Sequence, residues 1–213
     1  MKLRLLLLLI CTTTSLLSQS NFSIGLNAGG AFAKMGEQKD ESYARSNLLP
    51  VYSIDINYSG IFEKHFNIGL RYSMGGHRYK IQNYFNNKKV SAQLVQHAIG
   101  LNLFNNLPIE IKKKGKSNNI KSSCVSGIYS NYIITSAFSF ADEPKLNVYD
   151  QVKPFDFGLV GGLDLHLRDN RSHLCIKLRY FHGLKNLAKD DFIWKARRLE
   201  LGLQIGMTRN KND

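Results

Sequence analysis

The chain has 213 residues, 43% of them hydrophobic, and a formal net charge of +13. Its length fits one domain or two very small ones, and this hydrophobic share is ordinary for a folded protein and argues against an intrinsically disordered chain. The basic charge favours lipid headgroups or lipopolysaccharide as partners, unless it only keeps the loops soluble, and nucleic acid is not expected because no recognition motif appears.

Residues 1–20 have the features of an export signal. A short basic start is followed by an unbroken apolar run from Leu5 to Cys11, and then by small polar residues. This order is typical of a cleaved secretory signal peptide, and the apolar run is too short to span a bilayer. We therefore divide the chain into a signal peptide, residues 1–20, and an exported domain, residues 21–213.

Eight segments of the exported domain have the patterning of β-strands. Six of them alternate apolar with small or polar residues, which is the period-2 mark of a strand with one apolar face. These six segments are residues 22–32, 52–58, 66–74, 155–167, 174–180 and 199–207. A seventh strand falls within residues 90–112, where Asn105, Asn106 and Pro108 indicate a bulge or an end. The eighth is 124–134, whose facing the pattern leaves unassigned.

The connections between these segments alternate in length. The short ones are residues 59–64 and 168–173. The long, polar ones are residues 34–47, 142–154 and 183–197. This alternation is typical of bacterial outer-membrane barrels, which place long loops outside the cell and short turns in the periplasm. Residues 112–122 are an exception, because this connection is longer than the other expected periplasmic turns.

The apolar strand faces contact either lipid or a soluble core. The opposite faces carry Gly, Ser, Asn, Asp and Arg rather than the many Lys and Glu of a wet surface, which suits a narrow lumen filled by side chains. Aromatic residues gather at the strand ends, like the girdles of membrane barrels. We therefore predict an all-β, eight-stranded antiparallel up-and-down transmembrane β-barrel in the outer membrane. The alternative is a secreted lipocalin-like or sandwich protein.

Charged residues also fall on the faces that would point into the lumen. They are four acids and four bases: Asp55, Arg71, Asp156, Asp164, Lys177, Arg179, Arg198 and Glu200. Buried charges need partners, so we interpret this set as a salt-bridged structural plug that fixes the barrel register. The alternative is an ion path, although eight strands leave little room for water.

No motif for catalysis, metal binding or phosphate binding is present in the sequence. The six histidines are scattered without metal-ligand spacing, so we expect no metal, no cofactor and no enzymatic activity. His166 and Asp164 share the lumen face, and a serine joining them would make an outer-membrane hydrolase. Cys124 and Cys175 lie on strands two apart, and we expect two free, buried thiols rather than a disulfide.

Several stretches occur in an order that resembles a known family. After the signal peptide come FSIGLNAGGAF, LPIEIKK, CVSGIYSNYII, DFGLVGGLDLHL, CIKLRYFHGLKNL and RRLELGLQIGM. Together they resemble the PorT-like outer-membrane β-barrel proteins of Bacteroidota. The resemblance implies one long hairpin from about Phe66 to Lys112. It also implies a role through the loops, as an adaptor, adhesin or assembly factor with other envelope proteins, and a link to type IX secretion. A small transport pore is the second function.

Overall fold

The structure of the protein is a computed structural model in which nine stretches of the chain are described. They are residues 22–37, 43–45, 49–59, 65–82, 89–109, 120–140, 145–168, 172–189 and 192–207. The predicted signal peptide lies outside them. Their elements are β1 (Phe22–Glu37), β2 (Tyr43–Arg45), β3 (Leu49–Ser59), β4 (Phe66–Gln82), β5 (Lys89–Ile109), β6 (Ile120–Phe140), β7 (Leu146–Asn147), the 3-10 helix η1 (Tyr149–Gln151), β8 (Phe155–Arg168), β9 (Ser172–Gly183) and β10 (Phe192–Met207).

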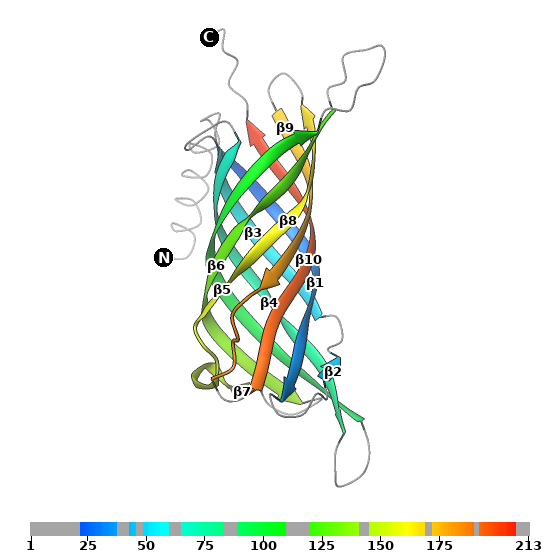
Figure 1. Ribbon diagram of the computed structural model, residues 1–213, viewed down its shortest axis with the longest axis vertical. Helices are drawn as coiled ribbons and strands as arrows, with labels where there is room; N and C mark the ends of the chain where they lie inside the picture. The colour runs from blue at the N-terminus through cyan, green and yellow to red at the C-terminus, as the bar shows by residue number, and fades with distance from the viewer. Residues whose placement is uncertain are drawn as a thin grey trace, which may run out of the picture.

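Eight of these strands form a closed antiparallel barrel (Figure 1). The order of neighbours is β1, β3, β4, β5, β6, β8, β9 and β10, and β10 pairs back onto β1. The short strands β2 and β7 add to the edges of β1 and β6. The predicted eight-stranded barrel is therefore confirmed. Within the described stretches, no helix has the length and apolarity needed to cross a membrane.

The predicted long hairpin is formed by β4 and β5. These strands pair from Phe66 opposite Asn105 to Gln82 opposite Lys89. Of the two alternatives predicted for residues 105–108, the end is confirmed, because the ladder with β4 stops at Asn105 and β5 ends at Ile109. The register shift of β5 against β6 lies between His97 and Ala98. Near Pro108, β5 still pairs with β6 although its ladder with β4 has ended. The missing N–H of proline is tolerated there because that edge of the strand is unpaired.

The two faces of the wall differ as the alternation predicts. Each barrel strand exposes aliphatic side chains on the outside, among them Leu26, Ile54, Leu70, Leu101, Ile128, Leu163, Leu178 and Leu203. The inside is narrow. A Cβ atom on Gly202 would lie 1.8 Å from the Oδ1 atom of Asn27, so glycine makes room there for a larger neighbour. Small residues on the inner face thus allow a thin barrel to be filled by side chains.

The structure assigns the facing of β6, which the sequence pattern left open. Val125, Tyr129 and Ile133 are buried inside, whereas Cys124 is exposed on the outer face. Cys175 on β9 is buried, and both thiols are free, as predicted. The expectation that both are buried was wrong for Cys124. Cysteine behaves as a small apolar residue, and a lipid-facing position suits it as well as a buried one.

Candidate functional site

The eight charged residues singled out from the sequence are all buried, with relative exposures between 2% and 8%. They come from the neighbouring strands β8, β9 and β10 and from the pair β3 and β4, and β1, which lies between β10 and β3, supplies none of them. Six of them take part in ion pairs: Asp55, Arg71, Asp164, Lys177, Arg179 and Glu200. Asp156 and Arg198 lie apart from these pairs and line a small cavity.

The largest group of pairs spans the middle of the lumen and is centred on Arg71. Its guanidinium pairs with Glu200, three strands away around the barrel, and its Nε atom lies 3.8 Å from the Oδ1 atom of Asp55. Lys177 approaches the other Asp55 oxygen at 3.9 Å. The Ser53 hydroxyl accepts a hydrogen bond of 2.8 Å from Arg71. We call these residues the ion-pair network, which connects β3, β4, β9 and β10 through the interior.

A second pair joins neighbouring strands β8 and β9. Arg179 donates to both oxygens of Asp164, and the Nη2–Oδ2 distance is 2.7 Å. Two parallel hydrogen bonds of this kind fix the relative orientation of both groups. The pair therefore locks the register of β8 and β9 as well as balancing charge.

Aromatic rings separate the interior charges, and sequence reasoning missed them. The Phe181 ring contacts two guanidinium groups, with its centroid 4.4 Å from Arg71 and 4.9 Å from Arg198. Arg198 also faces Tyr129, and Arg179 faces Phe104. Such cation–π contacts partly replace the water that a buried guanidinium loses. The signal was available, since Phe181 continues the inward parity of Lys177 and Arg179.

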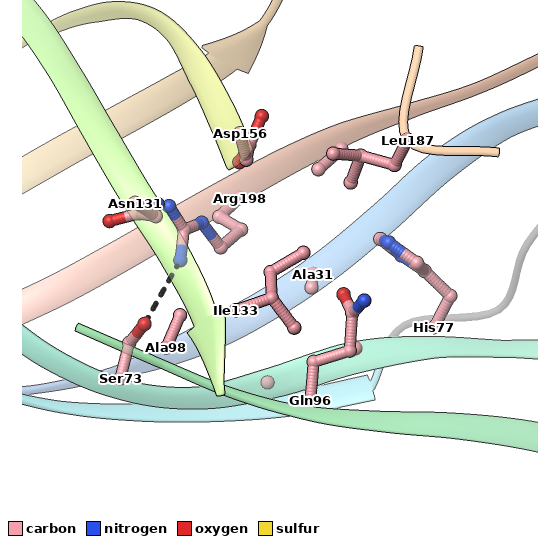
Figure 2. Close-up of a pocket in the computed structure, with 13 residues that line it drawn as sticks. Ala31, Ser73, His77, Gln96, Ala98, Asn131, Ile133, Asp156, Leu187 and Arg198 are labelled. Carbon is pink, nitrogen blue, oxygen red and sulfur yellow. Dashed lines mark hydrogen bonds between the residues drawn. The ribbon is translucent and has the colours of Figure 1, made fainter. Parts of the chain in front are cut away.

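A small cavity of about 30 Å³ lies beside Arg198 (Figure 2). Figure 2 shows Arg198 donating to Ser73, with Asp156 and Asn131 above and beside it. Among the described residues, the Oδ1 atoms of Asp156 and Asn131 have no hydrogen-bond partner within the protein. The cavity has room for about one or two water molecules that could satisfy them. It is too small for a solute.

Residues near the lower end of the barrel in Figure 1 form a buried apolar group that sequence reasoning also missed. Residues 145–154 and 183–189 continue the wall where β8 and β9 are short, and they bond to each other through Lys153 N–H and Leu187 C=O at 2.7 Å. Their buried residues join inward residues of β5, β6 and β10. We call this group the apolar cap: Leu94, Ala98, Ile133, Val152, Leu187, Ala188 and Ala196. Loop residues carry no strand parity, so no sequence pattern predicted it.

Toward the opposite end, β8 and β9 bring Cys175 close to Asp164 and His166, the two residues that the sequence pattern placed on one lumen face. One donor atom each of Asp164, His166 and Cys175 lies within 4.8 Å of the others. The Oγ atom of Ser123 on β6 lies 3.1 Å from His166 Nε2. The hairpin register explains the grouping, because His166 stands opposite Cys175. The sequence signal that could have indicated this register is the shortness of the connection RDNRSH, which places Arg168 opposite His173.

Comparisons with known proteins were made for the sequence and for the fold. The model of a family described as outer membrane protein beta-barrel domain matches residues 17–189. Among solved structures, Neisserial surface protein A is similar with 11% identity and a TM-score of 0.47, covering 86% of this chain and 96% of that one. OprG from Pseudomonas aeruginosa has 11% identity, a TM-score of 0.45 and coverages of 89% and 95%. A search of curated proteins gave no match.

Proposed function

This chain belongs to the outer membrane protein beta-barrel domain family. We propose that it works in the outer membrane as a sealed, non-enzymatic barrel that acts through its loops. The observation that carries this proposal is the filling of the interior. The ion-pair network and the arginine–aromatic stacks occupy the middle, and the apolar cap occupies one end. A barrel without an aqueous path offers its loops and its outer face as the surfaces available to partners.

The sealed interior favours this function over a small transport pore. Arg71 and Glu200 meet across the lumen, so an ion would have to displace a buried pair in order to pass. Breaking such a pair by losing one partner typically costs about 3–5 kcal/mol. The exposed aliphatic belt and the family also favour the outer membrane over the secreted lipocalin-like alternative.

Planar-bilayer recordings test the sealed barrel directly. The purified protein, shown to be folded by its heat-dependent gel mobility, should give no steady conductance. A double variant, Arg71→Ala with Glu200→Ala, removes both charges of the crossing pair, and its conductance is compared with that of the wild-type protein. Steady, ion-selective current through the wild-type protein would reject the sealed barrel and support the pore.

The absence of enzymatic activity is also part of the proposal. Ser123 and His166 form the one pair that resembles part of a hydrolase site within the described residues, and it faces the interior. A membrane lipid would approach the outer face instead, where this part of the wall presents residues such as Leu165. The proposal would be contradicted if the wild-type protein released fatty acid from outer-membrane lipid and the Ser123→Ala variant did not.

The barrel end that carries residues 145–154 and 183–189 offers a defined surface for other envelope proteins. The PorT resemblance supports a role of this surface in the assembly of a secretion machinery. Backbone hydrogen bonds fix residues 145–154 against 183–189, which gives a partner a preformed surface. A photo-cross-linking residue at exposed Lys189 should capture a defined envelope protein, whereas the same residue at belt position Ile128 should not. Normal type IX secretion in a deletion strain would remove the secretion role and leave the adhesin and adaptor roles.

Lipids are the second class of partner that we propose, lipopolysaccharide among them. A shallow apolar groove crosses the outer face where Ala28 lies between Tyr52 and Leu201. An acyl chain fits such a groove, since the surrounding side chains are aliphatic or aromatic. Ala28→Trp fills the groove and should reduce the lipopolysaccharide that co-purifies with the protein, measured by mass spectrometry. Unchanged co-purification would show that the groove does not select a lipid.

A further inference from the structure

The cluster of Asp164, His166 and Cys175 combines a carboxylate, an imidazole and a thiol on the inner face of one hairpin. Among the described residues, no other group of three such side chains converges in this way. We propose that this cluster binds a divalent transition-metal ion of the zinc type. The site is separate from the ion-pair network in chemistry, because its ligands include a thiolate and an imidazole, which zinc prefers over purely oxygen ligands.

The geometry is set by two strands of a rigid wall. His166 and Cys175 face each other in the register of β8 and β9, and Asp164 lies two residues before His166 on the same face. The donor atoms lie within 4.8 Å of one another, whereas the ligands of a tetrahedral zinc ion lie about 3.5 Å apart. Binding therefore requires the three side chains to rotate toward one another.

Neighbouring groups hold the ligands in place as outer partners do in metal sites. The Nε2 atom of His166 lies 3.1 Å from Ser123 Oγ. In the proposed site the Nε2–H group donates to that oxygen, and Nδ1 is the nitrogen that binds the metal. Arg179 holds both oxygens of Asp164, and each carboxylate oxygen keeps a second lone pair for a metal. Ser123 and Arg179 are therefore positioning residues of the site.

Binding the ion removes a proton from Cys175 and changes the net charge of the interior. The Sγ–H bond of Cys175 breaks, the proton passes to water, and a sulfur–metal bond forms. Two neighbouring cations are already paired, Lys177 with Asp55 and Arg179 with Asp164. The thiolate and the divalent ion together add one positive charge, so the fourth position suits an anion such as hydroxide or chloride. Three protein ligands leave that position vacant, as in zinc sites that bind an exchangeable ligand.

The ion can reach the cluster from the barrel end near the start of β1. His166 is only partly buried, and Lys121, two residues before Ser123 on β6, is exposed. Cys124, in contrast, lies on the outer face away from the cluster. The two cysteines of the barrel therefore form a matched pair for an experiment, because one belongs to the site and the other does not.

Cobalt absorption tests the site in the full chain, folded in detergent micelles under reducing conditions. Co²⁺ should produce the sulfur-to-cobalt charge-transfer absorption of a thiolate ligand, and Zn²⁺ should displace it. Cys175→Ser and His166→Asn should abolish that absorption, whereas Cys124→Ser should leave it unchanged. Ser123→Ala should weaken the affinity for Co²⁺ by about 10–100-fold, as removal of an outer partner does. Heat-dependent gel mobility shows for each variant that the barrel has folded.

Thiol labelling gives a second readout that needs no ligand substitution. In a Cys11→Ser, Cys124→Ser background, Cys175 is the single thiol of the chain. Zn²⁺ should slow its reaction with an alkylating reagent, and Mg²⁺ should not. Absence of a thiolate band with Co²⁺, or a band that survives Cys175→Ser, would overturn the proposal. Unchanged labelling in the presence of Zn²⁺ would overturn it too. None of these results would bear on the proposal that the barrel is sealed, which the conductance measurement tests separately.

Discussion

Two buried arginines of the interior have both a charged and an aromatic partner. Arg71 pairs with Glu200 and stacks over Phe181, and Arg179 pairs with Asp164 and faces Phe104. The guanidinium group suits this role, since its planar fork binds carboxylates and its flat faces stack on rings. Charge and packing are therefore not separable at these positions.

Removal of Arg179 leaves Asp164 as a buried carboxylate without its bidentate partner. Arg179→Ala should lower the free energy of unfolding by about 3–5 kcal/mol, the usual loss when one member of a buried pair is removed. Heat-dependent gel mobility in micelles measures this change. Arg78→Ala removes an exposed arginine from β4 and is the matched control, expected to have little effect. Equal stability of both variants would mean that the pair contributes nothing.

Consecutive residues of β10 lie on opposite faces of the barrel wall. Leu203 is 54% exposed on the outer face, whereas Gln204 points inward and donates to Ser23. Leu203→Arg should block assembly, because an arginine at the lipid-facing midplane of a barrel costs roughly 2–4 kcal/mol. Gln204→Arg should be milder unless it overfills the lumen. The measurement is the amount of folded protein in the outer-membrane fraction, and equal tolerance of both changes would contradict the assignment of faces.

At the scale of elements, β4 carries a break in its regular alternation. Gly76 has a φ of +155°, and the next residue, His77, is buried. A Cβ atom at Gly76 would lie 1.8 Å from the carbonyl oxygen of Leu94 on β5. Only glycine allows the two strands to approach there, so the long hairpin depends on this residue.

Gly76→Ala should destabilise the barrel, because the added methyl group meets backbone and the φ angle is strained for any other residue. A strained backbone position of this kind costs about 1–3 kcal/mol. Gly161→Ala on β8 is the control, since its nearest atom would be the Val125 oxygen at 3.8 Å. We expect a lower thermal midpoint for the first variant alone, measured by circular dichroism. A Gly76→Ala variant as stable as Gly161→Ala would show that the hairpin can shift.

Six of the eight strands were predictable in place and in facing, because each alternates with period 2 between a lipid-facing and an inward residue. The same parity places Arg71, Lys177 and Glu200 on the inner face, where the structure has them. Their partners could not be read in this way. Arg71 and Glu200 meet across three strand positions, so the contact depends on the closure of the barrel rather than on local pattern. Leu187 lies in a loop, and its burial follows from the early end of β9.

At the scale of the whole molecule, the exposed aliphatic belt determines where the protein can exist. Side chains such as Leu26, Leu163 and Ile205 would face water in a soluble protein. We expect the protein to stay in the outer-membrane pellet through urea or carbonate washing, and to change its gel mobility on heating. Recovery in the soluble periplasmic fraction after mild lysis would mean that the belt is covered by protein instead of lipid.

The closure of β10 onto β1 also determines how the molecule resists mechanical force. β10 is bonded along one edge from Ser23–Gly206 to Glu37–Phe192, and along the other to β9. A cantilever that pulls on the C-terminal end must therefore shear two ladders at once to remove the first strand. Every later strand then has a single remaining neighbour. The first rupture in a single-molecule pulling trace should need the largest force, and the remaining strands should peel away at lower tension.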